Sequence, residues 1–168
     1  MLSNTLNEGT SGQVMKFVVD RVESEQSRSL PTHLVDDFET LDAGQSVQTR
    51  EFTFAQGNTS GMWTINDQPF DPTVSIASPK LGTTELWRFS TDWVSHPVHV
   101  HLGHFQVLSR GGHPPDPSDA GWKDTVDLTQ DGTVEVLVKF TGYPGRYMLH
   151  CHNLEHEDMA MMANFTVE

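Results

Sequence analysis

The stretch HPVHVHLGHFQVLSR (residues 96–110) places Val98, Val100 and Leu102 at alternate positions, with polar residues between them. Successive side chains of a β-strand point to opposite faces, so a period of two predicts a half-buried strand rather than a helix. The stretch TVEVLVKF (133–140) repeats this pattern, with Val134, Val136, Val138 and Phe140 at alternate positions. The two stretches therefore indicate strands that each present one face to a core.

Shorter stretches with the same alternation occur on both sides of these two. They are EFTFAQ (51–56), MWTIND (62–67), TTELWRFS (83–90), GRYMLHCH (145–152) and ANFTVE (163–168). Gly, Pro, Asp and Asn lie between them, as in tight turns and surface loops. A chain of 168 residues is the size of one domain with a sizeable core. We therefore predict an all-β fold, an antiparallel β-sandwich.

Two N-terminal segments fit this sandwich less well. Residues 21–50 are charged and poor in apolar residues, which is typical of a linker or a long surface connection. Before them lies QVMKFVV (13–19), a single strand-like segment that needs a partner sheet to be stable. We assign residues 1–20 to the end of a neighbouring domain or subunit, 21–50 to a connection, and 51–168 to the sandwich.

The overall charge excludes some classes of partner. The formal net charge is −13, from 10 basic and 23 acidic residues, so the surface repels phosphate backbones and we expect no nucleic-acid partner. No apolar stretch reaches the roughly 18 residues of a membrane span, and no membrane association is expected. The start MLSNTLNEGTSGQ has no secretory signal pattern. A single cysteine allows no internal disulfide, so Cys151 is free, reactive or a metal ligand.

Seven of the nine histidines fall into two short clusters, which point to metal binding. Those before residue 110 are His96, His99, His101 and His104, and those after it are His150, His152 and His156. Because residues two apart on a strand share a face, His99 and His101 can reach one metal cluster, and so can His150 and His152. Cys151 lies between His150 and His152 and must point to the opposite face. The tripeptide His150–Cys151–His152 can therefore contact two separate sites, one on each face of the strand.

The site on the Cys151 face has the ligands of a blue-copper centre. Such a centre takes one thiolate, two imidazoles and a weak axial thioether, and it suits electron transfer. His156 follows Cys151 by five residues and Met161 by ten, so a short turn can return both to one metal. His96, just before a proline, is the natural second imidazole.

Other interpretations of these residues remain open at this point. Cys151 could be a buried structural cysteine or a nucleophile, although its flanking histidines face away and could not act as its base. A structural zinc site commonly takes several cysteines, which this chain lacks. Met161 could be a core residue like its neighbours Met159 and Met162. His104, His113 and His33 match no ligand position, and we expect His113 and His33 to be exposed.

HPVHVHLGHF (96–105) together with HCHNLEHEDMAMM (150–162) resembles the C-terminal cupredoxin domain of the multicopper oxidases, in particular the bacterial laccase, spore-coat laccase and bilirubin-oxidase branch. The similarity extends to GWKDTV (121–126) and covers most of residues 62–168. It implies a Greek-key cupredoxin β-sandwich, with 13–19 as the last strand of a preceding cupredoxin domain. It also implies a laccase-type copper oxidase that oxidises phenols, aromatic amines or metal ions one electron at a time and reduces dioxygen to water. An extracellular, periplasmic or spore-coat location would follow.

The resemblance also implies a role for each ligand. It assigns type 1 copper to His96, Cys151, His156 and Met161, type 2 copper to His99, and the type 3 pair to His101, His150 and His152. Electrons from a small reducing substrate would pass through Cys151 to this trinuclear cluster. Glu157 resembles an acidic position that relays protons to the oxygen site.

The chain departs from the family pattern in one respect. The family completes its trinuclear cluster with two H-x-H motifs from an N-terminal domain, whereas residues 1–95 hold one histidine, His33. We therefore expect a partner, an N-terminal multicopper oxidase chain or fragment, to supply those motifs. The chain could otherwise be a single domain taken out of a longer protein, a one-copper electron carrier without oxidase activity, or a copper-free β-sandwich binding module.

Overall fold

The fold of the described residues is built mainly from strands. The computed structural model describes residues 1–168 except 6–11, 25–28, 33, 58–60, 92 and 130–131, so the expectation for His33 lies outside them. It forms two units, Met1–Phe38 and Glu39–Glu168. Among the described residues no helix is both long and apolar enough to cross a membrane. The strands of the second unit are β3 (Ser46–Gln56), β4 (Trp63–Ile65), β5 (Thr84–Thr91), β6 (His96–Val100), β7 (His104–Arg110), β8 (Thr125–Leu128), β9 (Thr133–Lys139), β10 (Gly145–Cys151) and β11 (Met162–Val167).

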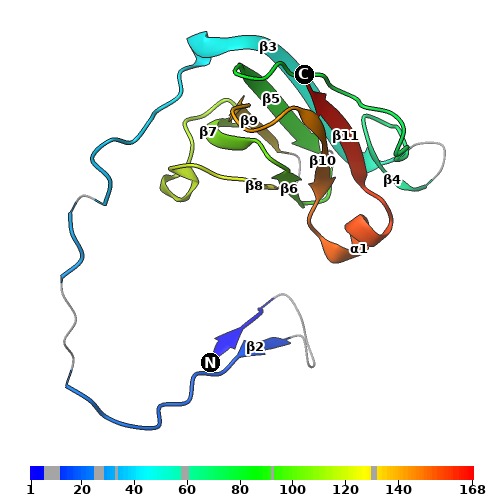
Figure 1. Ribbon diagram of the computed structural model, residues 1–168. Helices are drawn as coiled ribbons and strands as arrows, with labels where there is room; N and C mark the ends of the chain where they lie inside the picture. Colours follow the sequence, from blue (N-terminus) through cyan, green and yellow to red (C-terminus); the bar gives the residue numbers. More distant parts are fainter. Residues whose placement is uncertain (6–11, 25–28, 33, 58–60, 92, 130–131) are drawn as a thin grey trace. The chain divides into compact units, whose positions relative to one another are not determined.

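The second unit is a sandwich of two sheets (Figure 1). The five-stranded sheet has the order β4-β3-β5-β9-β7, and the four-stranded sheet has the order β11-β10-β6-β8. Every pair of neighbouring strands is antiparallel except β3 and β5, which are parallel. The all-β sandwich expected from the alternating pattern is confirmed.

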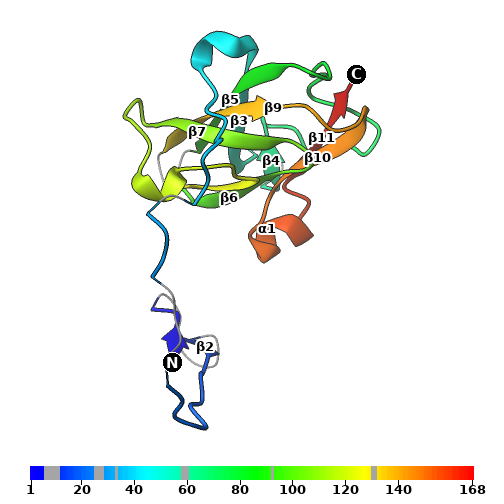
Figure 2. The ribbon, with the colours of Figure 1, turned by 60° about the vertical axis from the view of Figure 1, so that its left-hand side comes forward.

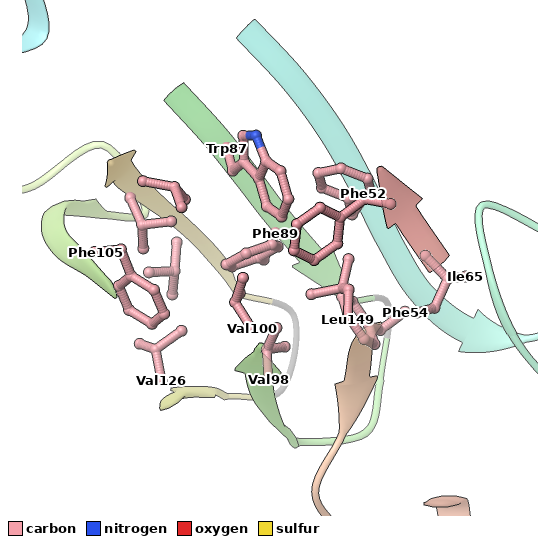
Figure 3. Close-up of a cluster of buried hydrophobic side chains, with 14 of the residues drawn as sticks. Phe52, Phe54, Ile65, Trp87, Phe89, Val98, Val100, Phe105, Val126 and Leu149 are labelled. Atoms are coloured by element: carbon pink, nitrogen blue, oxygen red, sulfur yellow. The ribbon is translucent and has the colours of Figure 1, made fainter. Parts of the chain in front are cut away.

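Apolar side chains from both sheets meet in one core (Figure 3). Val134, Val136 and Val138 on β9 are at most 1% exposed, so the alternation in this stretch marks the inward face as expected. The other inward residues drawn from the two sheets include Phe52, Phe54, Ile65, Trp87, Phe89, Val98, Val100, Phe105, Val126 and Leu149.

The sandwich begins earlier than residue 51, where the sequence placed its boundary. The compact unit starts at Glu39 and β3 starts at Ser46. Leu41 is buried, and its backbone N–H donates to Gln106 Oε1 over 2.9 Å. The first half of β3 is mostly exposed and polar, yet it pairs with β5 through its backbone. Backbone pairing needs no apolar side chains. The composition of residues 46–50 therefore resembles that of a linker, although these residues belong to a strand.

The N-terminal unit contains a small sheet of its own. β1 (Leu2–Ser3) pairs antiparallel with β2 (Gln13–Met15), and every residue of both strands is exposed. The expected single strand 13–19 is thus shorter, and it has a partner within this chain. Its assignment to a neighbouring domain stays a prediction.

The central pair of the four-stranded sheet brings the two histidine motifs together. β6 and β10 are antiparallel neighbours, and His150 lies opposite His99 while Cys151 lies opposite Val98. The single α-helix of the described residues, α1 (Leu154–Asp158), follows β10 and lies at the end of the sandwich where β10 finishes (Figure 2). Motifs about fifty residues apart in sequence therefore form one region.

Candidate metal centres

Three side chains form a compact triad inside the sandwich, which we call the inner triad: His96, Cys151 and His156. The two Nδ1 atoms of His96 and His156 are 3.1 Å apart. Cys151 Sγ lies 3.5 Å from His96 Nδ1 and 3.6 Å from His156 Nδ1. Three potential donor atoms thus face one point, contributed by β6, β10 and α1.

The size of the inner triad fits one metal ion. A divalent ion bound about 2.0 Å from imidazole nitrogen and about 2.3 Å from thiolate sulfur would separate its ligand atoms by about 3.1–3.7 Å at near-tetrahedral angles. The distances of 3.1, 3.5 and 3.6 Å lie in that range. Two imidazoles and one thiolate are a soft donor set, which suits copper with a weak fourth ligand.

Burial controls the protonation of the inner triad. Cys151 and His96 are 0% exposed and His156 is 7% exposed. Loss of solvent raises the pKa of the Cys151 thiol to about 11, and the negative charge of Glu157 acts in the same direction. Burial also lowers the pKa of His156. Without a metal, the site therefore holds a protonated thiol at neutral pH beside a neutral His156 imidazole.

The chain after α1 returns Met161 to this triad. Ala160 adopts a left-handed conformation (φ 63°), which reverses the chain after the helix. The Met161 N–H then donates to the His156 carbonyl over 2.9 Å, and the Cys151 N–H donates to the Met161 carbonyl over 3.1 Å. Met161 is 0% exposed, whereas Met159 is 50% exposed. Met161 is thus buried, and its backbone is hydrogen-bonded to two residues of the triad.

A second group of histidines lies on the opposite face of the β6–β10 pair, and we call it the outer cluster: His99, His101, His150 and His152. One ring nitrogen from each of His99, His101 and His150 lies within 4.8 Å of the others. The Nε2 atoms of His101 and His150 are 3.1 Å apart. The His152 ring centroid is 5.3 Å from that of His150 and 5.5 Å from that of His99. All four rings predicted for the second site are therefore neighbours.

Backbone carbonyls fix the orientation of two of these rings. His99 Nδ1 lies 3.0 Å from the Asp124 carbonyl, and His150 Nδ1 lies 3.0 Å from the Cys151 carbonyl. A carbonyl can only accept, so each Nδ1 carries the proton and each Nε2 presents a lone pair. Burial lowers the pKa of His99 and of His101, and nearby histidines add to both shifts. These shifts favour, for His99 and His101, the neutral form that a metal requires.

Glu157 lies at the edge of the outer cluster. Its Oε2 is 3.9 Å from Nδ1 of His150 and 3.9 Å from Nδ1 of His152. Its side chain is 35% exposed, so the carboxylate contacts both solvent and the cluster.

Two other histidines lie outside both groups, as expected. His104 is exposed at the start of β7 and lines a surface cavity with Trp122 and Lys139, and His113 is exposed in a loop. Sequence reasoning missed two contacts. Thr125 Oγ1 lies 2.9 Å from His99 Nδ1, and the Trp63 ring stacks on His156. Neither has a sequence signal, because both contacts arise from tertiary packing between separate elements, β6 with β8 and β4 with α1.

Comparisons with known proteins show the family of this chain. Residues 44–168 match a family model described as multicopper oxidase. The chain is 39% identical over 148 residues to a laccase of Haloferax volcanii, covering 84% of this chain and 25% of that protein. It is 36% identical over 163 residues to a bilirubin oxidase of Albifimbria verrucaria, covering 91% and 28% respectively. The chain thus spans about a quarter of the length of these relatives.

Solved structures show the same similarity. A laccase from Pediococcus acidilactici superposes with a TM-score of 0.76 at 29% identity, covering 86% of this chain and 32% of that one. A laccase-like multi-copper oxidase from Ochrobactrum sp. gives a TM-score of 0.71 at 34% identity, covering 80% and 33%. That enzyme is described as active towards lignin model compounds and lignosulfonate.

We predict that metal binding at the inner triad releases one proton. The pKa of the Cys151 thiol is raised to about 11, so the thiol stays protonated between pH 7 and 9 and must ionise to bind. The apparent affinity for Co²⁺ should therefore rise about tenfold per pH unit over this range. Titrations followed by the thiolate–cobalt absorption at pH 7, 8 and 9 measure this slope. Cys151→Ser, the control, should lack the band, and a flat profile in the unaltered chain would contradict a thiolate ligand.

Proposed function

The chain belongs to the multicopper oxidase family as a C-terminal cupredoxin domain, and from this membership we propose that it is the electron-accepting part of a laccase-like copper oxidase. The observation that carries the proposal is the tripeptide His150–Cys151–His152. Its cysteine enters a complete inner triad while its histidines enter the outer cluster on the opposite face. We assign type 1 copper to the inner triad with Met161 as axial ligand.

We further propose that the outer cluster is half of a trinuclear copper site. His99 would bind type 2 copper, and His101, His150 and His152 would bind the type 3 pair. His101 and His152 are exposed, which leaves this face open to further ligands. An N-terminal multicopper oxidase segment, as a partner chain or a preceding part of a longer chain, would supply two H-x-H motifs. The roughly threefold to fourfold greater length of the relatives supports this.

The residues of this chain provide the path between the two sites. Copper bound at both sites would supply one-electron oxidation of a donor and reduction of dioxygen to water. Cys151 links the inner triad to the outer cluster through covalent bonds, since its backbone continues directly into His150 and His152. His96 and the buried core around it exclude water from the inner triad. The described activity of the Ochrobactrum enzyme towards lignin model compounds supports phenolic or other aromatic donors. Metal ions are a second class of donor that we propose.

We propose a proton-relay role for Glu157. Dioxygen reduction to water consumes protons, and a carboxylate at hydrogen-bonding or single-water distance can deliver them. Glu157 contacts solvent with one part of its side chain and lies 3.9 Å from two outer-cluster rings. Its position on α1 keeps it near the outer cluster while His156 of the same helix serves the inner triad.

The first prediction of the proposed function concerns copper content. Reconstituted alone, the chain should bind about one copper strongly with an intense blue band, and together with an N-terminal partner about four, with oxygen uptake. Cys151→Ser should abolish the blue band, whereas His104→Ala, at an exposed histidine outside both groups, should keep it. A blue band that survives Cys151→Ser would make the type 1 assignment wrong. One copper without oxygen uptake in every assembly would indicate an electron carrier, and no copper at all would exclude both functions.

A second prediction tests Met161 as the axial ligand. Met161→Leu should keep the blue colour but raise the reduction potential, because a weak axial thioether stabilises the oxidised metal. We expect the equilibrium with a one-electron mediator to shift at least about tenfold, equivalent to about 59 mV. Met159→Leu is the matched control at a half-exposed neighbour and should cause no shift. Equal potentials in the two variants would show that Met161 is only a core residue.

A third prediction tests Glu157 in the completed assembly. Glu157→Gln should slow dioxygen reduction by about 10²-fold or more, which is the usual contribution of a positioned proton donor. Reduction of the inner copper by the donor should change much less, because Glu157 lies nearest to the outer-cluster rings and burial outweighs its charge at Cys151. Glu155→Gln, on an exposed part of the same helix, is the control. Unchanged oxygen uptake with Glu157→Gln would exclude the relay.

A further inference from the structure

Trp63 makes an unusually close ring contact with the inner triad. Its ring centroid lies 3.9 Å from that of His156 at an interplanar angle of 31°, the shortest ring separation among the described residues. It also lies 5.7 Å from the His96 ring in an edge-to-face arrangement at 77°. One indole therefore contacts both imidazoles of the triad.

The Trp63 indole comes from the five-stranded sheet, which supplies none of the three triad residues. His96 and Cys151 lie on the four-stranded sheet and His156 lies on α1, whereas Trp63 begins β4 at the edge of the five-stranded sheet. β4 is firmly held: Trp63 pairs with Gln56 on β3, and Thr64 and Ile65 are each 1% exposed. Trp63 itself is partly exposed, so it forms a layer between solvent and the buried triad.

His156 needs such external support because its own helix is short. α1 has five residues, and a helix of this length gains little stability from its own hydrogen bonds. Asn153 caps it by accepting the Glu155 N–H over 3.2 Å, but this contact fixes the backbone and not the imidazole. The close, tilted stacking of Trp63 restricts the orientation of the His156 ring and so the direction of Nδ1.

We propose that Trp63 is a positioning residue of the inner metal site, which holds the His156 ring toward Cys151 and excludes water. The inference rests on the proposed type 1 copper site. Two neutral imidazoles and one thiolate leave a net charge of +1 with Cu²⁺ and of zero with Cu⁺. Water stabilises the charged, oxidised state, so an apolar cover favours the reduced state and raises the potential. Trp63 thereby sets how readily the site accepts an electron.

Copper-loaded variants test this role through two measurements, the reduction potential of the inner copper and its visible absorption spectrum. Trp63→Ala should shift the equilibrium with a one-electron mediator about tenfold toward the oxidised site, a fall of about 59 mV, and alter the blue band. Trp63→Phe should restore most of both, because it keeps a flat apolar ring. Trp122→Ala, at a partly exposed tryptophan that lines a cavity with His104, is the matched control and should change neither. An unchanged potential and band in Trp63→Ala, or an equal shift in Trp122→Ala, would overturn the proposal.

A measurement on the metal-free chain separates this proposal from the function on which it rests. Ring stacking should move the proton NMR signals of the His156 imidazole upfield, and Trp63→Ala should remove that shift while Trp63→Phe retains part of it. If the unaltered chain binds no copper, the copper site is wrong, yet this comparison still decides whether Trp63 holds the ring. Identical His156 signals in the unaltered chain and in Trp63→Ala would overturn the positioning role.

Discussion

The antiparallel register between β6 and β10 is the constraint on which both candidate sites depend. It sets His150 opposite His99 and Cys151 opposite Val98. Because side chains alternate along a strand, this one register sends Cys151 into the core beside His96 and sends His150 and His99 to the opposite face. A slip of one residue would exchange the faces and break both groups at once. The buried apolar residues Val98, Val100 and Leu149 oppose such a slip, since it would expose them.

The register alone does not complete either group, because the remaining ligands lie beyond the strand ends. His156 and Met161 come from α1 and the turn after it, and His101 follows the last residue of β6. Left-handed residues lie at both places, Ala160 before Met161 and Leu102 after His101. Such conformations are unfavourable for residues with a Cβ, and they persist where surrounding contacts determine the backbone. Rigid strands thus place the central ligands, and strained turns place the outer ones.

This division explains how much could be predicted from the sequence. The alternation in residues 133–140 predicted the inward face of β9, and the spacing of His150, Cys151 and His152 predicted two faces, because both follow from strand geometry. The start of β3 at Ser46 was not predictable from apolar residues, since backbone hydrogen bonds hold that part of the strand. The contact of Trp63 with His156 and that of Thr125 with His99 join separate elements. No local pattern encodes them.

The inner triad and the outer cluster differ in how many of their ligands this chain supplies and in how far they are buried. The donors of the inner triad all come from one chain: His96 and Cys151 are fully buried, and the partly exposed Trp63 stacks on His156. The outer cluster has two rings held by carbonyls, but His101 and His152 remain exposed. A buried thiolate site excludes water by itself, whereas an open group of imidazoles can hold a multinuclear metal cluster only when further ligands cover it. Under the proposed function, Cys151 would join a site whose donors all come from this chain to one that needs further ligands, so electron uptake and oxygen reduction would not have to depend on the same piece of protein.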